Sequence, residues 1–356
     1  RYGEAPLPEI VFANLSEEKK RKLAKGEFSS VLLNEIQNSL KSQEQVILFQ
    51  NRRGHSPMVQ CQDCQWIPHC IHCDVSLTYH QYKHALVCHY CGYREEMPHQ
   101  CPTCSSKRIL TLGYGTEKLE EELKIHFPET QIQRMDLDTT RSKTGYDSIM
   151  EAFEQGQTNI LVGTQMVTKG LDFDRVNLVG IFDADRMLHF PDFRSHERAF
   201  QLMVQVSGRA GRRAKKGRVV IQTNQPDHPI FAYVVNHDVK GFMDHELPDR
   251  QSYFYPPFTR LISIMLKHYD KKIVNDSAQQ LAEAISRQIK GIRLIGPGEP
   301  IVNKVRNEYL MNILLKIPRD RGHLADIKMI LRELADRLIQ HGTFRNVKVV
   351  FDVDPM

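Results

Sequence analysis

The chain has 356 residues, of which 41% are hydrophobic, and a formal net charge of +5 at pH 7. This length predicts two or three domains, and the hydrophobic fraction is ordinary for a globular protein. No apolar run approaches the length of a membrane span, so the sequence predicts no membrane partner. The charge is uneven, because residues 251–356 carry 17 Lys and Arg against 11 Asp and Glu. Such a basic C-terminal third is compatible with a partner that bears phosphates.

The first part of the chain predicts the start of an α/β domain. It begins with Arg1 rather than Met, so we expect a piece of a longer protein. Residues 1–26 are polar and without a clear period, which indicates a linker or an incoming arm. Apolar residues then recur at helical spacing from Ser29 to Leu40, and residues 45–49 predict a buried strand.

All eight cysteines follow in one 44-residue window, as four C-x-x-C pairs: Cys61/Cys64, Cys70/Cys73, Cys88/Cys91 and Cys101/Cys104. A C-x-x-C turn lets two thiolates meet one tetrahedral ion, so four pairs close two structural Zn²⁺ sites. The window is too short and too polar to bury a core of its own, so we expect the metals to replace one. Spacing alone leaves open which pairs share an ion, since four pairs combine in three ways.

Other interpretations of this window are weaker. Four disulfides are typical of secreted modules, but we expect no signal peptide, and no cysteine lies outside the window. A redox C-x-x-C normally occurs once, not four times. The window also contains six histidines, which we interpret as surface or outer-sphere residues: His69, His72, His80, His84, His89 and His99. Trp66 and Tyr79 could stack on a base, but packing beside a zinc site is the better interpretation.

Alternating strands and helices continue after the window. Strands are predicted at 109–112, 131–136, 159–163, 177–182 and 218–223. Helices are predicted at 117–127, with Thr116 as the N-cap, and at 146–155, 195–206 and 229–237. This alternation predicts a parallel sheet covered on both faces, with the cysteine window as an insertion.

A boundary rich in proline and aromatic residues, 248–257, precedes a shorter α+β pattern. Strands are predicted there at 260–267, 309–317 and 346–353, and helices at 274–289 and 323–341. We therefore divide the chain into an arm (1–26), an α/β domain (27–240) interrupted by a zinc insert (57–108), a linker (241–258) and a C-terminal domain (259–356).

Two segments of the α/β domain carry polar residues suited to a nucleotide. Residues 160–173 run from a buried strand into a loop with a hydroxyl, an amide, a lysine and an acid, at the edge where open α/β sheets bind ligands. In the second segment, Gln205 to Arg212, the two arginines stand three apart among small residues. Both can point from a helix end toward a polyphosphate, where an arginine stabilises the charge that develops in phosphoryl transfer.

These segments resemble a helicase family. Residues 205–212 are similar to the last conserved motif of superfamily 2 helicases, and residues 163–172 to the motif before it. Further matching segments are 113–123, 192–198, 256–258 and 352–355. Together with the cysteine pairs they resemble the PriA family of bacterial replication-restart helicases, also called primosomal protein N-prime, from about residue 45 onward. The resemblance implies an α/β fold: a RecA-like helicase lobe 2 with an inserted two-zinc domain, followed by a small α+β C-terminal domain.

The resemblance also implies residue roles. Arg209 and Arg212 would face the ATP phosphates, with Arg212 the better candidate for an arginine finger, and Gln205 would help to position the nucleotide or the attacking water. Gly170 and Asp172 would couple the nucleotide cleft to the DNA, and toward the DNA backbone would lie Thr164, Gln165 and Lys169. The family pairs the cysteines in nested fashion, with Cys61, Cys64, Cys101 and Cys104 on one ion and Cys70, Cys73, Cys88 and Cys91 on the other. Its C-terminal domain, with a fold like ribosomal protein S-ten, binds DNA.

One part of the family pattern is missing. A helicase needs a P-loop for the phosphates and a D-E-x-H-type strand end for Mg²⁺, and neither motif occurs in these residues. Asp183-Ala184-Asp185 resembles the latter superficially, but a helix-capping or lobe-contact role is the better interpretation. Lys304 and Arg306 could bind DNA phosphate, or they could be solvated surface residues without a partner. We therefore expect the second lobe, zinc insert and C-terminal domain of a helicase whose first lobe is missing here.

The implied function is part of an ATP-dependent 3′-to-5′ DNA helicase, using two Zn²⁺, ATP and Mg²⁺, that recognises stalled forks and starts primosome assembly. Expected partners are single-stranded and forked DNA, single-stranded DNA-binding protein, other primosome components and the machinery that loads the replicative helicase. The implied location is the bacterial cytoplasm, at the nucleoid. We expect this chain alone to be inactive as an ATPase. An alternative is a non-enzymatic zinc-bearing module that binds DNA and docks proteins. A zinc hydrolase is a poor third, because all-cysteine sites leave no position for a catalytic water.

Overall fold

The computed structural model describes residues 7–51, 58–64, 66–80, 85–112, 115–136, 139–140, 143–168, 173–190, 192–211, 216–319, 324–340 and 342–355. The chain forms two compact units. The first comprises Arg1–Ser56 and Gly113–Met243, and the second Pro57–Leu112 and Asp244–Met356. The cysteine window therefore belongs to the second unit, although in sequence it interrupts the first.

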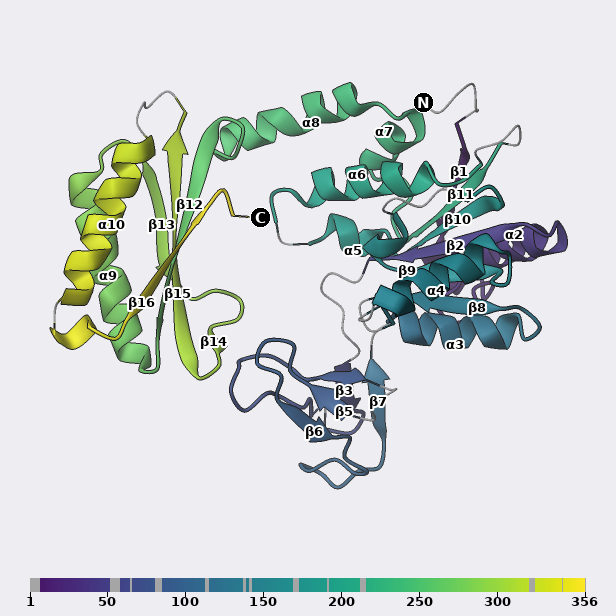
Figure 1. Ribbon diagram of the computed structural model, residues 1–356, viewed down its shortest axis with the longest axis horizontal. Helices are drawn as coiled ribbons and strands as arrows, with labels where there is room; N and C mark the ends of the chain where they lie inside the picture. Colours follow the sequence, from purple (N-terminus) through teal and green to yellow (C-terminus); the bar gives the residue numbers. More distant parts are fainter. Residues whose placement is uncertain are drawn as a thin grey trace. The chain divides into compact units, whose positions relative to one another are not determined.

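The first unit is built on a six-stranded parallel sheet in the order β1-β11-β10-β2-β9-β8 (Figure 1). Its strands are β1 (Glu9–Asn14), β2 (Gln45–Gln50), β8 (Ile132–Met135), β9 (Ile160–Gly163), β10 (Val176–Phe182) and β11 (Arg218–Thr223). Every residue of β2 and β9 is buried. Central parallel strands are covered on both faces, which explains their continuous apolar runs.

Helices cover both faces of this sheet, as the alternation predicts. The helices of the unit are α1 (Leu15–Lys20), α2 (Ser30–Lys41), α3 (Thr116–His126), α4 (Lys143–Glu154), α5 (Asp185–Leu188), α6 (Ser195–Ser207) and α7 (Ile230–Asn236). Leu32 and Ile36 of α2 and Leu119 of α3 pack on one face. Phe153 of α4, Met203 of α6 and the helix α7 pack on the other. The sequence-based α/β fold class is confirmed.

The N-terminal segment differs from its interpretation as an arm. Residues 9–14 add strand β1 to the edge of the sheet, paired in parallel with all of β11, and α1 follows, capped by the Asn14 side chain. The strand was missed because it lies at an edge, where only Ala13 is buried and the apolar pattern is therefore weak. A second difference concerns α3, whose N-cap is Gly115 rather than Thr116.

The cysteine window folds as a five-stranded antiparallel sheet in the order β6-β5-β4-β3-β7. Its strands are β3 (Met58–Cys61), β4 (Thr78–His80), β5 (Ala85–Val87), β6 (Arg94–Glu96) and β7 (Ile109–Leu112). The sequence predicts that β7 resumes the α/β sheet, but in the structure it pairs with β3 instead. The window also has a small apolar cluster of its own, in which Val59, Leu77 and Leu86 pack with buried cysteines.

The C-terminal domain is an antiparallel sheet with two helices on one face (Figure 1). Its strands are β12 (Thr259–His268), β13 (Arg293–Gly298), β14 (Lys304–Val305), β15 (Glu308–Pro318) and β16 (Lys348–Val353). The helices are α9 (Lys271–Gln288) and α10 (Leu324–Gln340), followed by the short 3₁₀ helix η3 (Gly342–Phe344). Alternate residues of β12 and β15, such as Ile264 and Ile313, pack under α9 and α10.

Helix α8 (Val239–Ser252) occupies much of the segment that we had interpreted as a linker. Among the described residues, no helix is both long and apolar enough to cross a bilayer.

Candidate functional site

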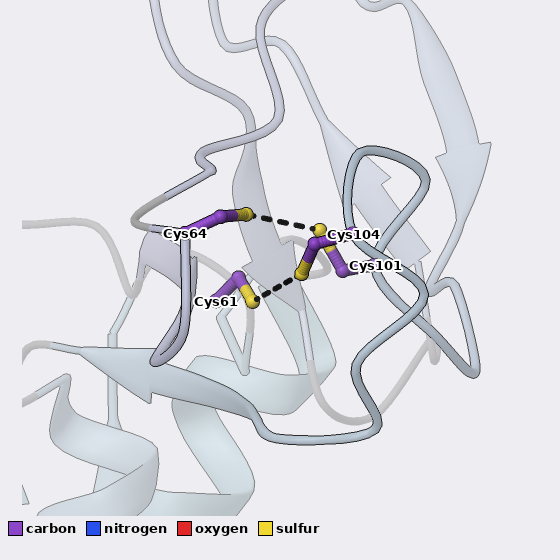
Figure 2. A group of neighbouring side chains, drawn as sticks. All are labelled: Cys61, Cys64, Cys101 and Cys104. Atoms are coloured by element: carbon purple, nitrogen blue, oxygen red, sulfur yellow. Dashed lines mark hydrogen bonds between the residues drawn. The ribbon is translucent and has the colours of Figure 1, made fainter.

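The first cysteine cluster joins the two ends of the insert. It contains Cys61, Cys64, Cys101 and Cys104, whose sulfurs all lie within 4.8 Å of one another. The Cys61 and Cys104 sulfurs are 3.6 Å apart and those of Cys64 and Cys101 are 3.5 Å apart (Figure 2). Cys61 ends β3, and β3 pairs with β7, which begins five residues after Cys104. The antiparallel pairing therefore brings the first and last cysteine pairs together.

The second cluster lies inside the first one in sequence. It contains Cys70, Cys73, Cys88 and Cys91, again with all sulfurs within 4.8 Å, and the Cys70 and Cys91 sulfurs are 3.5 Å apart. Three of these residues are buried. The structure thus brings together the two nested sets that the family resemblance implies, and no other combination of the pairs.

Both clusters fit Zn²⁺. A tetrahedron with Zn–S bonds of about 2.3 Å places its sulfurs about 3.8 Å apart, close to the separations found here, whereas a disulfide would need about 2.05 Å. Burial raises the pKa of the Cys70 thiol to about 12, so zinc has to displace a proton from this sulfur when it binds. Four thiolates fill the coordination sphere and leave no position for water, which is the arrangement of a structural metal site.

The four C-x-x-C turns share one backbone pattern. The N–H of each first cysteine donates to the carbonyl oxygen five residues later: Cys61 to Trp66, Cys70 to Val75, Cys88 to Tyr93 and Cys101 to Ser106. These turns aim both sulfurs of a pair to the same side, where a second pair can complete the site. Trp66 and Tyr79 pack against the apolar cluster of the insert, as their packing interpretation predicts.

The loop that follows α6 carries the arginine candidates. Gln205 lies on the last turn of the helix, and i→i+3 hydrogen bonds extend the turn through Arg209 to Ala210. Gly211 then ends the turn with a φ of +64°, which favours glycine, and its N–H donates to Val176 O at 3.1 Å. A side chain on Gly217 would collide with the backbone of Ala210 and Gly211. The hydrogen bond to Val176 and the close packing of Gly217 therefore fix residues 210 and 211 from two sides.

The loop after β9 lies against the same helix. Thr164 is buried, and residues 165–168 form the 3₁₀ helix η2, which packs on α6 through Val167. Gly163 allows this close turn, because an added side chain would meet the backbone oxygen of Met135 at 2.8 Å. The structure thus places Gln165 on, and Thr164 directly before, an element that packs on α6, the helix that carries Gln205 and ends just before Arg209. The remaining candidates, Lys169, Gly170, Asp172 and Arg212, lie outside the described residues.

Asp185, which could be mistaken for a metal ligand, has a structural role. Its buried carboxylate accepts hydrogen bonds from the Thr223 hydroxyl at 2.6 Å and from the Asn224 N–H at 2.7 Å. It therefore ties the start of α5 to the end of β11.

Lys304 and Arg306 lie in the hairpin of β14 and β15, which packs on the insert rather than standing free. Lys304 Nζ is 5.4 Å from the centre of the Tyr309 ring, and the Arg306 side chain is exposed. The backbone of the hairpin contacts the second cysteine cluster, a role that sequence reasoning missed because it depends on main-chain groups 233 positions from Cys73.

Three family models match the chain. They are the helicase conserved C-terminal domain over residues 98–214, the PriA DNA helicase Cys-rich region domain over residues 70–95, and the primosomal protein N C-terminal domain over residues 251–356. The cysteine-rich match spans the second cluster. Along the chain the Cys-rich match comes first, the helicase match second and the C-terminal match last.

Curated relatives match along the whole chain. The replication restart protein PriA of Bacillus subtilis is 37% identical over 356 residues, which is all of this chain and 44% of that protein. The Haemophilus influenzae protein of the same name is 38% identical over 330 residues, covering 92% of this chain and 44% of the relative. The chain thus spans somewhat less than half the length of these relatives.

Solved structures give weaker matches. The yeast Dbp5 complex with RNA and ADP BeF3 aligns with a TM-score of 0.35 and 12% identity, covering 69% of this chain and 45% of that one. Since this score lies below 0.5, the fold assignment rests on the strand order described above. The sequence matches are sufficient, and the chain belongs to the PriA family of replication restart proteins.

Proposed function

We propose that this chain supplies the second lobe, the zinc insert and the C-terminal DNA-binding domain of an ATP-dependent 3′-to-5′ DNA helicase that restarts replication at stalled forks. The observation that carries the proposal is the fixed loop after α6, which holds Arg209 on a turn locked by Gly211 and Gly217. Guanidinium groups held at a fixed position suit a developing phosphate charge, because they need no reorganisation during the reaction.

The segment at the end of α6 and the loop after β9 have different roles in this proposal. Arg209 and Arg212 stabilise the charge on the ATP phosphates, and Gln205 orients the nucleotide or the attacking water. Thr164, Gln165 and Lys169 contact the DNA backbone, and Gly170 and Asp172 link them to the nucleotide. ATP and Mg²⁺ supply the phosphoryl group and its charge neutralisation. No P-loop sequence occurs in these 356 residues, so the phosphate cradle has to come from another lobe.

The wider setting is also part of the proposal. Single-stranded and forked DNA are the nucleic-acid partners, and the basic C-terminal domain, with Lys304 and Arg306 among its candidates, contributes phosphate contacts. Single-stranded DNA-binding protein, other primosome components and the loading machinery of the replicative helicase are the protein partners. The family membership supports these assignments, and with them we propose a location in the bacterial cytoplasm, at the nucleoid.

The test is alanine substitution of Arg209 and Arg212, separately, in a full-length PriA-family protein that contains this chain. We expect each variant to lose most DNA-stimulated ATP hydrolysis, by about 10³-fold or more for the finger, while fork binding stays near the parent value. Arg21→Ala, on the exposed ion pair with Glu17 in the same unit, is the matched control. Equal losses of hydrolysis and fork binding would refute the assignment, as would ATP turnover by this chain alone.

A non-enzymatic role is the second candidate. The observation that favours it is that the insert and the C-terminal domain form one compact unit with two closed metal sites. Such a unit can bind DNA and dock proteins without chemistry. Fork binding by this chain that weakens steeply with salt would support phosphate contacts, and a flat salt response would argue against them.

A further inference from the structure

All four C-x-x-C turns share the hydrogen bond from the first cysteine, but one turn differs from the others in the hydrogen bonds made after its second cysteine. In three turns the sulfur of the second cysteine accepts a hydrogen bond from the N–H two residues later: Cys64 from Trp66, Cys91 from Tyr93 and Cys104 from Ser106. In the turn of Cys70 and Cys73, the corresponding N–H of Val75 donates to Cys73 O instead, at 2.9 Å. The sulfur of Cys73 therefore loses its local donor.

A second hydrogen bond of this turn is also replaced. In two sister turns the N–H four residues after the first cysteine donates back to its carbonyl: Gly92 to Cys88 and Ser105 to Cys101. The equivalent residue of the departing turn is Asp74, and its N–H donates at 2.8 Å to Lys304 O, in the C-terminal domain.

The hairpin of β14 and β15 supplies what the turn lacks. The N–H of Arg306 donates to Cys73 Sγ at 3.3 Å, in the position that the local donor takes elsewhere. The next residue, Asn307, donates from its backbone to His72 O at 2.8 Å, and its side chain lies 3.1 Å from His72 Nδ1. Val305 packs against the apolar cluster of the insert. Contacts thus come from three successive residues of one turn.

The hairpin is shaped for this contact. Arg306 and Asn307 have φ values of +53° and +64°, and this left-handed pair forms a tight turn that points both N–H groups outward. Four thiolates around Zn²⁺ leave an excess of negative charge, which N–H donors and nearby cations stabilise. A turn that presents two successive main-chain N–H groups supplies such donors.

We infer that the β14–β15 hairpin is part of the second zinc site, as the outer-sphere donor to Cys73, and that the metal in turn fastens the C-terminal domain to the insert. Zinc binding at this site and docking of the hairpin are then thermodynamically coupled: bound zinc stabilises the docked hairpin, and the docked hairpin raises the zinc affinity by the same factor. We assign no such role to the first zinc site, because the backbone donors found for it in the described part of the chain, among them Trp66 to Cys64 and Ser106 to Cys104, lie within the insert.

The two sites provide a matched comparison. In the 356-residue chain loaded with zinc, Cys88→Ser combined with Cys91→Ser removes the second site, and Cys61→Ser combined with Cys64→Ser removes the first. Hydrogen exchange followed by mass spectrometry should show the Arg306 and Asn307 amides exchanging at least tenfold faster in the first variant and unchanged in the second. Unchanged exchange in both variants, or the same increase in both, overturns the inference.

The reverse coupling is tested on the hairpin itself. Proline at position 306 has no N–H and cannot adopt a φ of +53°. Glycine at this position keeps the N–H and adopts a positive φ readily, so Arg306→Gly is the matched control. We expect Arg306→Pro to release one of its two zinc equivalents 10–100-fold faster to a colorimetric chelator, the range typical of lost outer-sphere partners. Arg306→Gly should release both at the parent rate. Identical release from Arg306→Pro and the parent chain overturns the inference.

Discussion

The packing of Gly217 makes a prediction about the arginine-bearing loop that can be worked from the structure. A Cβ at this position would meet Ala210 O at 2.6 Å and would lie still closer to the Ala210 carbonyl carbon and the Gly211 nitrogen. Ordinary contacts of a Cβ begin at 3.4 Å, and the nearest atom, the Ala210 carbonyl carbon, would lie at 2.3 Å, so Gly217→Ala has to push the loop away by about 1.1 Å. All three atoms belong to the backbone, and no side-chain rotation can relieve the collision.

The displacement should reduce both stability and activity. Overpacking of this kind destabilises by about 1–3 kcal/mol, which lowers the melting temperature of a unit this size by about 2–12 °C. A shift near 1 Å of a positioned charged group can reduce turnover by about 10²-fold. We therefore expect Gly217→Ala in a full-length PriA-family protein to fold and to bind forks, but to hydrolyse ATP about 100-fold more slowly.

The assay is DNA-stimulated ATP hydrolysis at a temperature well below both melting points, with fork affinity measured in parallel. Gly342→Ala is the matched control, because a Cβ there meets no atom within 4 Å. Parent-level turnover in Gly217→Ala would refute the view that this contact positions the arginines. A loss of fork binding as large as the loss of turnover would also refute it, since the effect would then not be confined to the nucleotide site.

Three further predictions concern the core, the metal and the linker. Leu48→Ala, in the fully buried strand β2, should destabilise the first unit by about 2–5 kcal/mol in denaturant unfolding, and an effect below 1 kcal/mol would contradict the central position of this strand. Because burial raises the pKa of Cys70 to about 12, zinc binding should release protons, and calorimetry in buffers of different ionisation enthalpy should detect them; zinc release should accelerate as the pH falls from 7.5 to 5.5. Burial lowers the pKa of Lys316, whose Nζ donates to Tyr253 O at 2.7 Å. The unfolded chain therefore binds this proton more tightly, so as the pH rises toward 10.5 the parent should gain stability relative to Lys316→Met, and a constant difference would contradict this.

The sheet of the first unit could be predicted where burial is complete. Strands β2, β9 and β11 were placed within a residue of their ends, because central strands carry uninterrupted apolar residues. The edge strand β1 could not, since only Ala13 of its six residues is buried. Strand β7 shows a different limit: its residues predict a strand correctly, but nothing in them says which sheet it joins.

The zinc ligands were the most predictable part of the site, because metal chemistry restricts residue type and spacing together. The pairing of the turns was not determined by spacing and depends on the antiparallel alignment of β3 with β7. The contact of Arg306 with Cys73 had no local signal at all, because it is made by a main-chain N–H that every residue except proline possesses. Contacts of this kind can be found only once the fold brings distant segments together.

The two clusters, although each is built from four cysteines, act on different parts of the molecule. The first joins Cys61 to Cys104, 43 positions apart, and therefore closes the insert where it leaves and rejoins the chain. The second is enclosed within that loop and holds a turn of the C-terminal domain. Loss of the first metal should therefore open the insert at its base, whereas loss of the second should leave the base closed and free the C-terminal domain. A protein that loses its two zinc ions one at a time would then pass through one of two different intermediates, and the site that empties first decides which.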